Sequence, residues 1–434
     1  MPDSLLTEFQ TAYRNLELGP LLDQKDLDRF HVDYSEDTIA GLVQLIEDTS
    51  SVASKVIFSG HRGCGKSTLL AEFSRSPLLG NHYFAVMFSI AATVENSDVD
   101  HVNILFAIAL NLMIEAEKHE VAIPKATQAV IYKWFAEQTQ TDTKELKGEA
   151  SFGIDLLKAV TLKLQTNAGV RREIKQKFER NASELVGQLN VIAATIQAAT
   201  KKTILVIIDD LDKLELAVVR PIFRDNVKTL CLPGFHIIYT IPMATLRDGE
   251  IRTVVRTETN NQIEQMPVLK LFSREESHNP DAVPNVAMMN VLCEVLHKRI
   301  PDRLLDRATA ETLIRYSGGV LREIIRIANE CCRICLRQVR REPENAAIII
   351  NDRILEEAVN NIRNDFALTI GKVGYEILFK VYQDFEPDDP LQREFLDLLH
   401  ELTLLEYRNH KVWYDVHPIV VELLSDRGYD LNAH

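Results

Sequence analysis

The sequence lacks the features that mark secreted, membrane-spanning or disordered chains. No apolar run approaches the ~20 residues that a helix needs to cross a bilayer, and the most apolar stretches, such as residues 204–208, are only strand-length. Residues 1–10 hold acidic side chains and no basic ones, so they do not predict a secretory signal. Glycine and proline number only 17 and 15 in 434 residues, which argues against a long flexible linker. We therefore expect a cytoplasmic, globular protein that does not contact a membrane.

Cysteine is also scarce, with six residues in the chain. Cys332 and Cys335 have the C-x-x-C spacing of half a zinc site, but no second Cys or His pair follows at a suitable distance. Together with Cys331 they lie in an apolar run with helical periodicity. This setting favours buried, reduced thiols over metal ligands.

The balance of charge limits the class of partner. The net charge is −14, which argues against a protein that coats nucleic acid, because affinity for a phosphate backbone depends on lysine and arginine. Two segments are nevertheless basic, residues 158–180 and a predicted helix with six arginines. Each suits a solvated helix face, and nucleic acid or an acidic partner remains open as an alternative. The six are Arg322, Arg326, Arg333, Arg337, Arg340 and Arg341.

Five short runs rich in valine and isoleucine predict strands. They show little polar alternation, as is typical of parallel strands buried on both faces. Helical stretches alternate with them, which is the pattern of an α/β domain. Residues 103–199, far more than a crossover helix needs, predict a helical insertion with breaks near Pro124 and at 148–153. The predicted strands are residues 55–59, 84–90, 203–209, 236–241 and 267–271.

One segment carries the strongest chemical signal. Gly60-His61-Arg62-Gly63-Cys64-Gly65-Lys66-Ser67 fits G-x-x-x-x-G-K-[ST], follows a predicted strand and precedes a helical run from Thr68. Glycines let such a loop curl so that backbone N–H groups point at phosphate oxygens, and the following helix adds its positive end. We expect residues 60–68 to bind the nucleotide, with Lys66 at the β- and γ-phosphates of ATP and the Ser67 hydroxyl on Mg²⁺.

Acidic residues end the third predicted strand. Residues 204–208 lead directly into Asp209 and Asp210, and open α/β sheets bind ligands outside the carboxyl ends of their strands. Asp209 is expected to hold Mg²⁺ through water, and Asp210 to orient or deprotonate the attacking water. Capping aspartates at an ordinary strand end are the alternative. Asp212 completes the acidic cluster and equally suits a solvated turn.

Further polar residues suit a site of hydrolysis. Thr240 ends the fourth predicted strand, where its hydroxyl can touch the γ-phosphate or the water, although threonine is also a common strand residue. Arg322 follows Ser317-Gly318-Gly319-Val320-Leu321 at a helix start, from which it can reach the phosphates. Arg220 and Arg224 are candidates for an arginine that acts on a neighbouring subunit.

The C-terminal residues predict helix, helix and hairpin, which is the element order of a winged-helix module. Residues 404–407 and 412–414 form the hairpin around a turn at 408–411. Acidic side chains clearly outnumber basic ones in 365–434, including the helix in the recognition position, 391–402. Such a helix suits a DNA groove poorly, so an intramolecular or protein contact is favoured.

The phosphate loop, the Asp209–Asp210 strand end, the Thr240 strand and the Gly-Gly-x-x-Arg helix start together resemble the AAA+ and STAND branch of P-loop ATPases. The resemblance spans residues 28–338. It implies an α/β fold, with a P-loop NTPase parallel sheet of order 5-1-4-3-2, a helical insertion, a helical lid and a C-terminal winged-helix-like domain. The implied domains are an N-terminal helical segment (1–27), a core (28–275) with its insertion (about 103–199), a lid (286–345) and the winged-helix-like domain (350–434).

The resemblance also implies residue roles. Thr240 and Arg322 take the two sensor positions, and residues 30–34 take the place where these families seat adenine. Residues 414–421 resemble the His motif of STAND switch proteins, which implies that His417 contacts the β-phosphate of ADP and holds the molecule closed. Pro418 stands where that motif carries an acidic residue.

These residues predict an ATPase that uses ATP or ADP with Mg²⁺ as a conformational switch, and that assembles with itself or with a protein partner. The resemblance implies a role in bacterial regulation or defence. A DNA-associated AAA+ ATPase of the initiator or transposition-regulator type is the alternative. A nucleotide-holding scaffold with negligible hydrolysis is a third hypothesis.

Overall fold

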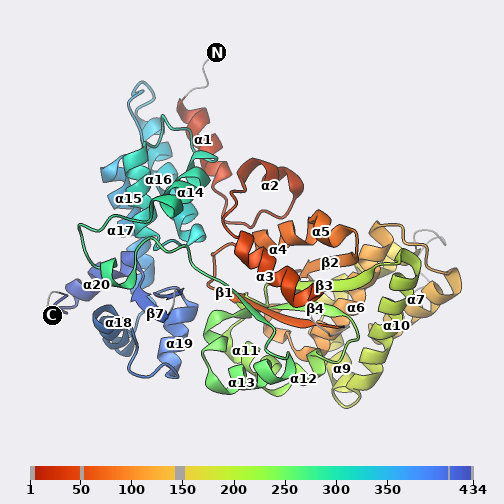
Figure 1. Ribbon diagram of the computed structural model, residues 1–434. Coiled ribbons are helices and arrows are strands. Elements are labelled where there is room, and N and C mark those ends of the chain that lie inside the picture. The colour runs from red at the N-terminus through yellow and green to blue at the C-terminus, as the bar shows by residue number, and fades with distance from the viewer. Residues whose placement is uncertain (1–4, 49–52, 142–151, 409–410, 432–434) are drawn as a thin grey trace. The chain divides into compact units, whose positions relative to one another are not determined.

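A computed structural model describes residues 5–48, 53–141, 152–408 and 411–431. The chain forms two compact units, and most of their elements are labelled in Figure 1. The sheet unit holds residues 37–59 and 69–265, and the P-loop unit holds residues 1–36, 60–68 and 266–434. The phosphate loop therefore belongs to a different unit from the strand that precedes it.

A five-stranded parallel sheet forms the centre of the sheet unit. Its order is β2-β3-β4-β1-β5, which confirms the predicted order 5-1-4-3-2. β2 and β3 pair over their full length, from Tyr83 opposite Thr203 to Ser89 opposite Asp209. Because parallel strands run in one direction, their carboxyl ends share one edge of the sheet. The strands are β1 (Lys55–Gly60), β2 (Tyr83–Ser89), β3 (Thr203–Asp209), β4 (His236–Pro242) and β5 (Ile263–Met266).

The fifth strand lies earlier in the sequence than predicted. We expected residues 267–271, whereas β5 spans Ile263–Met266. It forms the edge of the sheet beside β1, where Ile57 donates a backbone hydrogen bond to Gln262 (2.9 Å). Its side chains are mostly half-buried, so no apolar run marks it, and Pro267 has no N–H with which to continue the ladder. The prediction was wrong because it followed apolar content alone.

The residues between β2 and β3 are helical, as predicted. α6 packs against β2 and α10 against β3, and these helices share one apolar core with the sheet. The predicted break near Pro124 separates α6 from α7, while most of the predicted break at 148–153 lies outside the described residues. The helices of this unit are α3 (Glu36–Glu47), α4 (Lys66–Arg75), α5 (Pro77–Gly80), α6 (His101–Lys118), α7 (Lys125–Gln138), α8 (Phe152–Thr166), α9 (Ala168–Glu179), α10 (Ala182–Thr200), α11 (Leu216–Arg220), α12 (Val227–Leu230) and α13 (Gly249–Glu258).

The P-loop unit is built mainly of helices around α16. α1, α14, α15 and α17 pack against it, and residues 317–320 separate it from α15 close to the predicted Ser-Gly-Gly break. α16 buries Cys331, Cys332 and Cys335, and burial raises the pKa of the Cys335 thiol to about 12. The helices are α1 (Leu5–Asn15), α2 (Gln24–Phe30), α14 (Val286–His297), α15 (Arg307–Tyr316), α16 (Leu321–Arg341), α17 (Asp352–Ala367), α18 (Lys372–Asp384), α19 (Arg393–His400) and α20 (Pro418–Asp426).

We call α17–α20 and the hairpin of β6 (Leu404–Arg408) and β7 (Val412–Val416) the C-terminal module. The predicted order of two helices and a hairpin is observed, and residues 409–410 of the predicted turn lie outside the described residues. Tyr407 and Trp413 stack with ring centroids 4.6 Å apart. The Tyr407 hydroxyl donates to the Gly318 carbonyl (2.7 Å), which joins the hairpin to the turn between α15 and α16. Among the described helices, none combines the length and the apolar content that crossing a membrane requires.

Candidate nucleotide-binding site

The phosphate loop joins β1 to α4 by a tight backbone turn. Gly63 and Gly65 have φ values of +78° and +103°, in a region that other residues rarely occupy. α4 begins at Lys66, so the loop runs directly into a helix N-terminus, which favours an anion. Lys66 is buried, and its Nζ donates to the carbonyl oxygens of Gly60 (2.8 Å) and His61 (2.7 Å). A phosphate held by the loop would take the place of these acceptors.

Two segments of the P-loop unit approach the glycines of the loop closely. Arg322, near the start of α16, donates its N–H to the Gly63 carbonyl (2.9 Å), and a Cβ on Gly63 would lie 2.4 Å from the Arg322 Cβ. A Cβ on Gly65 would lie 2.0 Å from the Tyr34 hydroxyl. These approaches leave no room for a side chain on either glycine. The structure thus brings the predicted sensor Arg322, and Tyr34 of the predicted adenine segment, to the phosphate loop.

The C-terminal module also contacts the phosphate loop. The Glu406 N–H donates to His61 Nε2 (2.7 Å), and Arg62 Nη2 donates to His400 Nε2 (2.7 Å). His61 and Arg62 are variable positions of the loop motif, so the motif leaves them available for this contact. Sequence reasoning missed His400 and Glu406, because they lie 338 and 345 residues from their partners and belong to no motif.

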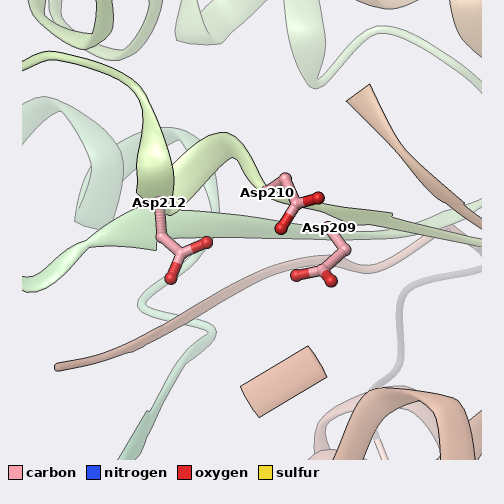
Figure 2. Close-up of side chains that lie close together, drawn as sticks. All are labelled: Asp209, Asp210 and Asp212. Carbon is pink, nitrogen blue, oxygen red and sulfur yellow. The ribbon is translucent and has the colours of Figure 1, made fainter. Parts of the chain in front are cut away.

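Three carboxylates gather where β3 ends (Figure 2). Asp209 is the last residue of the strand, and Asp210 and Asp212 lie in the turn that follows. Asp210 has a φ of +69°, which turns the chain sharply out of the sheet. One oxygen of each carboxylate lies within 4.8 Å of the other two. The strand end therefore concentrates negative charge at the edge of the sheet where α/β folds bind ligands.

The donor set of this cluster fits Mg²⁺. Asp209 and Asp212 are only 4% and 3% exposed, and carboxylate oxygens are the hard donors that this ion prefers. A bound cation would offset the free-energy cost of burying these charges. Asp209 and Ser67 belong to different units, so a magnesium ion held by both stays a prediction.

Asp210 is held by two side chains of the sheet unit. Ser89 Oγ, at the end of β2, donates to Asp210 Oδ2 (2.5 Å), and Lys213 forms an ion pair with the same carboxylate. These partners fix the orientation of the carboxylate. Sequence reasoning missed both residues, although the parallel alignment of β2 and β3 places Ser89 opposite Asp209. The role of Asp210 in activating water stays a prediction.

Thr240 is fully buried, and its hydroxyl lies against the turn that carries the aspartates. The hydroxyl donates to the Ile208 carbonyl (3.1 Å) and accepts from the Leu211 N–H (3.1 Å). It therefore clamps the chain on both sides of Asp209 and Asp210. This geometry gives Thr240 a positioning role, while its predicted contact with phosphate or water stays a prediction.

Replacing Thr240 by valine is expected to destabilise the sheet unit by about 1–3 kcal/mol, because it leaves a buried donor and a buried acceptor unsatisfied. Denaturant unfolding measures the loss. Thr240→Ser keeps the hydroxyl and serves as the control, with a smaller loss. Equal stability of the valine and wild-type proteins would contradict the clamp.

The two candidate arginines for a neighbouring subunit form ion pairs within the sheet unit. Arg220 contacts Asp248 and Glu250, and Arg224 contacts Glu250 (3.2 Å). Both arginine side chains are 44% exposed. The Arg224–Glu250 pair is exposed on both sides and therefore contributes little stability.

His417 lies in the interior of the C-terminal module. Its side chain is fully buried, the ring packs on Phe366 with centroids 5.3 Å apart, and Nδ1 accepts from the Ile419 N–H (3.3 Å). Burial, together with the electrostatic effects of the nearby Arg326 and His61, lowers the pKa of His417 to about 3. The ring is therefore neutral near pH 7 and carries its proton on Nε2, which has no hydrogen-bond partner in the described part of the chain.

Residues 36–239 match the KAP family P-loop domain. The matched segment contains both the phosphate loop and the Asp209–Asp210 strand end. No curated protein matches the sequence. With the sheet order and the loop geometry described above, the match shows that the chain contains a P-loop NTPase domain.

Among the solved structures that resemble the fold, three examples have low sequence identity to this chain. A Walker-type ATPase of Pyrococcus abyssi is 13% identical with a TM-score of 0.43, and the alignment covers 95% of this chain and 99% of that protein. Cdc6p from Pyrobaculum aerophilum is 10% identical with a TM-score of 0.38, covering 94% and 97%. The ORC1 protein of Aeropyrum pernix, solved in complex with DNA, is 11% identical with a TM-score of 0.37, covering 94% and 96%.

Proposed function

We propose that the protein is an ATP-binding and ATP-hydrolysing switch of the AAA+/STAND type, in which the nucleotide state controls conformation or assembly. The observation that carries the proposal is the contact between the phosphate loop and the C-terminal module, through His61 with Glu406 and Arg62 with His400. Because the residues that contact the module belong to the phosphate loop itself, a change in the conformation of the loop alters these contacts.

The roles of the site residues follow from their chemistry. Lys66 and the backbone N–H groups of the loop receive the phosphates of ATP. Ser67 and Asp209 would hold Mg²⁺, which would supply neutralisation of the negative charge on the phosphates. Asp210 orients the attacking water, and Arg322 responds to the γ-phosphate from the start of α16.

The contacts of the loop give the switch its two states. Lys66 donates to the carbonyls of Gly60 and His61, so its move to a phosphate removes two contacts that hold the backbone beside His61. The His61 ring accepts the Glu406 N–H and follows that backbone. Phosphate binding and attachment of the C-terminal module are therefore coupled. Each changes the equilibrium constant of the other by the same factor.

His417 contributes a second contact in the ADP state. Its neutral ring offers one N–H at Nε2, which suits a β-phosphate oxygen and costs less to bury than an imidazolium. Replacing His417 by alanine is expected to speed ADP release. Unchanged ADP retention in purified His417→Ala protein would refute this contact.

Replacing His400 by alanine tests the link to the module without altering the phosphate loop. Loss of the charge-assisted hydrogen bond from Arg62 is expected to speed release of a fluorescent ADP analogue by about ten-fold or more, since such bonds contribute about 1.5–3 kcal/mol. His297→Ala, on α14 and paired with Asp302, is the matched control. If His400→Ala folds normally and releases ADP at the wild-type rate, the module does not control the site.

ATP turnover with and without duplex DNA separates the switch from a DNA-associated ATPase. The switch predicts turnover that is indifferent to DNA. Strong stimulation by duplex DNA would favour the alternative, and tight ATP binding without turnover would leave only a scaffold role.

A further inference from the structure

A basic pocket lies between the first helix of the chain and α16, away from the phosphate loop residues. α1 and α16 pack side by side, and the pocket along their contact has a volume of about 310 Å³. Four of its lining residues are arginines, and one is an aromatic residue. The pocket is lined by Gln10, Tyr13, Arg14, Arg333, Leu336, Arg337 and Arg340.

The arginines of the pocket outnumber the acidic residues that pair with them. Arg333 bonds to Glu330 (2.6 Å), and Arg337 lies 3.5 Å from Glu357. The second pair is weak, because both side chains are 49% exposed. Neither Arg14 nor Arg340 forms an ion pair within the ranges that the structure describes. The pocket therefore carries an excess of positive charge in a protein whose net charge is −14.

The arginines of α16 form a row and not a compact cluster. Arg333, Arg337 and Arg340 are spaced by four and three residues, which places them on one face of the helix. At 1.5 Å per residue the row is about 10 Å long. Arg14 adds a guanidinium from the last turn of α1. A row of this length suits successive phosphates of one chain better than a single small anion, and guanidinium groups bind phosphates through paired N–H bonds.

Tyr13 supplies an aromatic ring on which an unpaired base can stack. Its side chain is 37% exposed and lines the same pocket as the arginines. Single-stranded nucleic acids are held by basic grooves whose exposed aromatic rings stack on bases. Gln10 adds an amide that can donate to and accept from base edges. We infer that the pocket between α1 and α16 binds single-stranded nucleic acid. The arginines would contact the phosphates, and Tyr13 would stack on a base.

Binding to fluorescein-labelled oligothymidylate, followed by anisotropy in the full-length protein, tests this inference. If four phosphates are neutralised, affinity should fall on the order of fifty-fold between about 50 and 200 mM salt. The Arg14→Glu/Arg340→Glu double variant should bind about ten-fold or more weakly. Tyr13→Ala should weaken binding by about five-fold or more, and Tyr13→Phe should retain it.

Matched variants distinguish binding at this site from nonspecific attraction to the protein's positive charges. Lys372→Glu/Arg393→Glu makes the same change in net charge on exposed positions of the C-terminal module and should leave binding unchanged. Lys66→Ala should also bind the oligonucleotide normally. The test of this site is therefore independent of whether the proposed ATP switch is correct. Oligouridylate in place of oligothymidylate shows whether RNA or DNA binds more tightly.

Several results would overturn the inference. These are no binding at low salt, equal binding by the arginine double variant, or equal displacement by polyglutamate of the same charge concentration. A preference for duplex that is indifferent to Tyr13→Ala would also exclude a single-strand site. Circular dichroism of each variant establishes that a loss of binding is not a loss of folding.

Discussion

Replacing Lys66 by alanine is expected to lower ATP turnover by roughly 10²–10³-fold or more, the size of effect seen when one electrostatic contact to a developing charge is removed. Lys66 is buried within the loop, and its ammonium group donates to the carbonyl oxygens of Gly60 and His61. No other lysine lies in the loop segment, and the guanidinium of Arg62 donates to His400. Release of phosphate at saturating ATP is the measurement.

The control for this experiment is Lys372→Ala. Lys372 has a side chain that is 90% exposed on α18 and a weak pair with Glu376, so turnover should remain at the wild-type level. Thermal unfolding of both variants separates lost chemistry from lost structure. Wild-type turnover in folded Lys66→Ala protein would exclude the P-loop as the catalytic site.

Replacing Gly319 by alanine is expected to destabilise the P-loop unit by about 3–5 kcal/mol, or to prevent its folding. Gly319 has a φ of +83°, and a Cβ there would lie 1.8 Å from the Leu269 carbonyl oxygen. The obstacle is backbone, so it cannot be relieved by a side-chain rotation. Because the residue immediately precedes Val320 and α16, the strain would move the start of the helix that contacts Gly63.

Gly19→Ala is the matched control for this change. Gly19 lies in the same unit, and a Cβ there would meet nothing within 4 Å. Its unfolding free energy should stay within about 0.5 kcal/mol of wild type. A similarly small effect of Gly319→Ala on denaturant unfolding would show that the turn between α15 and α16 adjusts, and would contradict the assigned geometry.

The sheet and its loop were predictable because their signals are local. The phosphate loop has a fixed spacing of glycines, and β3 is an apolar run that ends in Asp209 and Asp210. β5 was misplaced because an edge strand with half-buried side chains has no apolar signature. Its position is set by pairing with β1, which no stretch of sequence displays by itself.

The contacts that surround the loop were not predictable for a different reason. Glu406 acts through its backbone N–H, which every residue except proline has, and His400 acts through its ring but belongs to no motif. The contacts of the Thr240 hydroxyl with the turn after β3 were also not predicted, while its contact with phosphate or water stays a prediction. A sequence indicates that a side chain can form a hydrogen bond, but the partner depends on packing of distant elements.

The membership of residues 60–68 in the P-loop unit has a mechanical consequence. This short stretch packs with α16 and the C-terminal module, yet its two ends continue into β1 and the body of α4, which belong to the sheet unit. A relative movement of the two units would therefore bend the backbone of residues 60–68. The N–H groups of this stretch are the ones that we propose to hold the phosphates of ATP, so its bending would change the affinity for nucleotide.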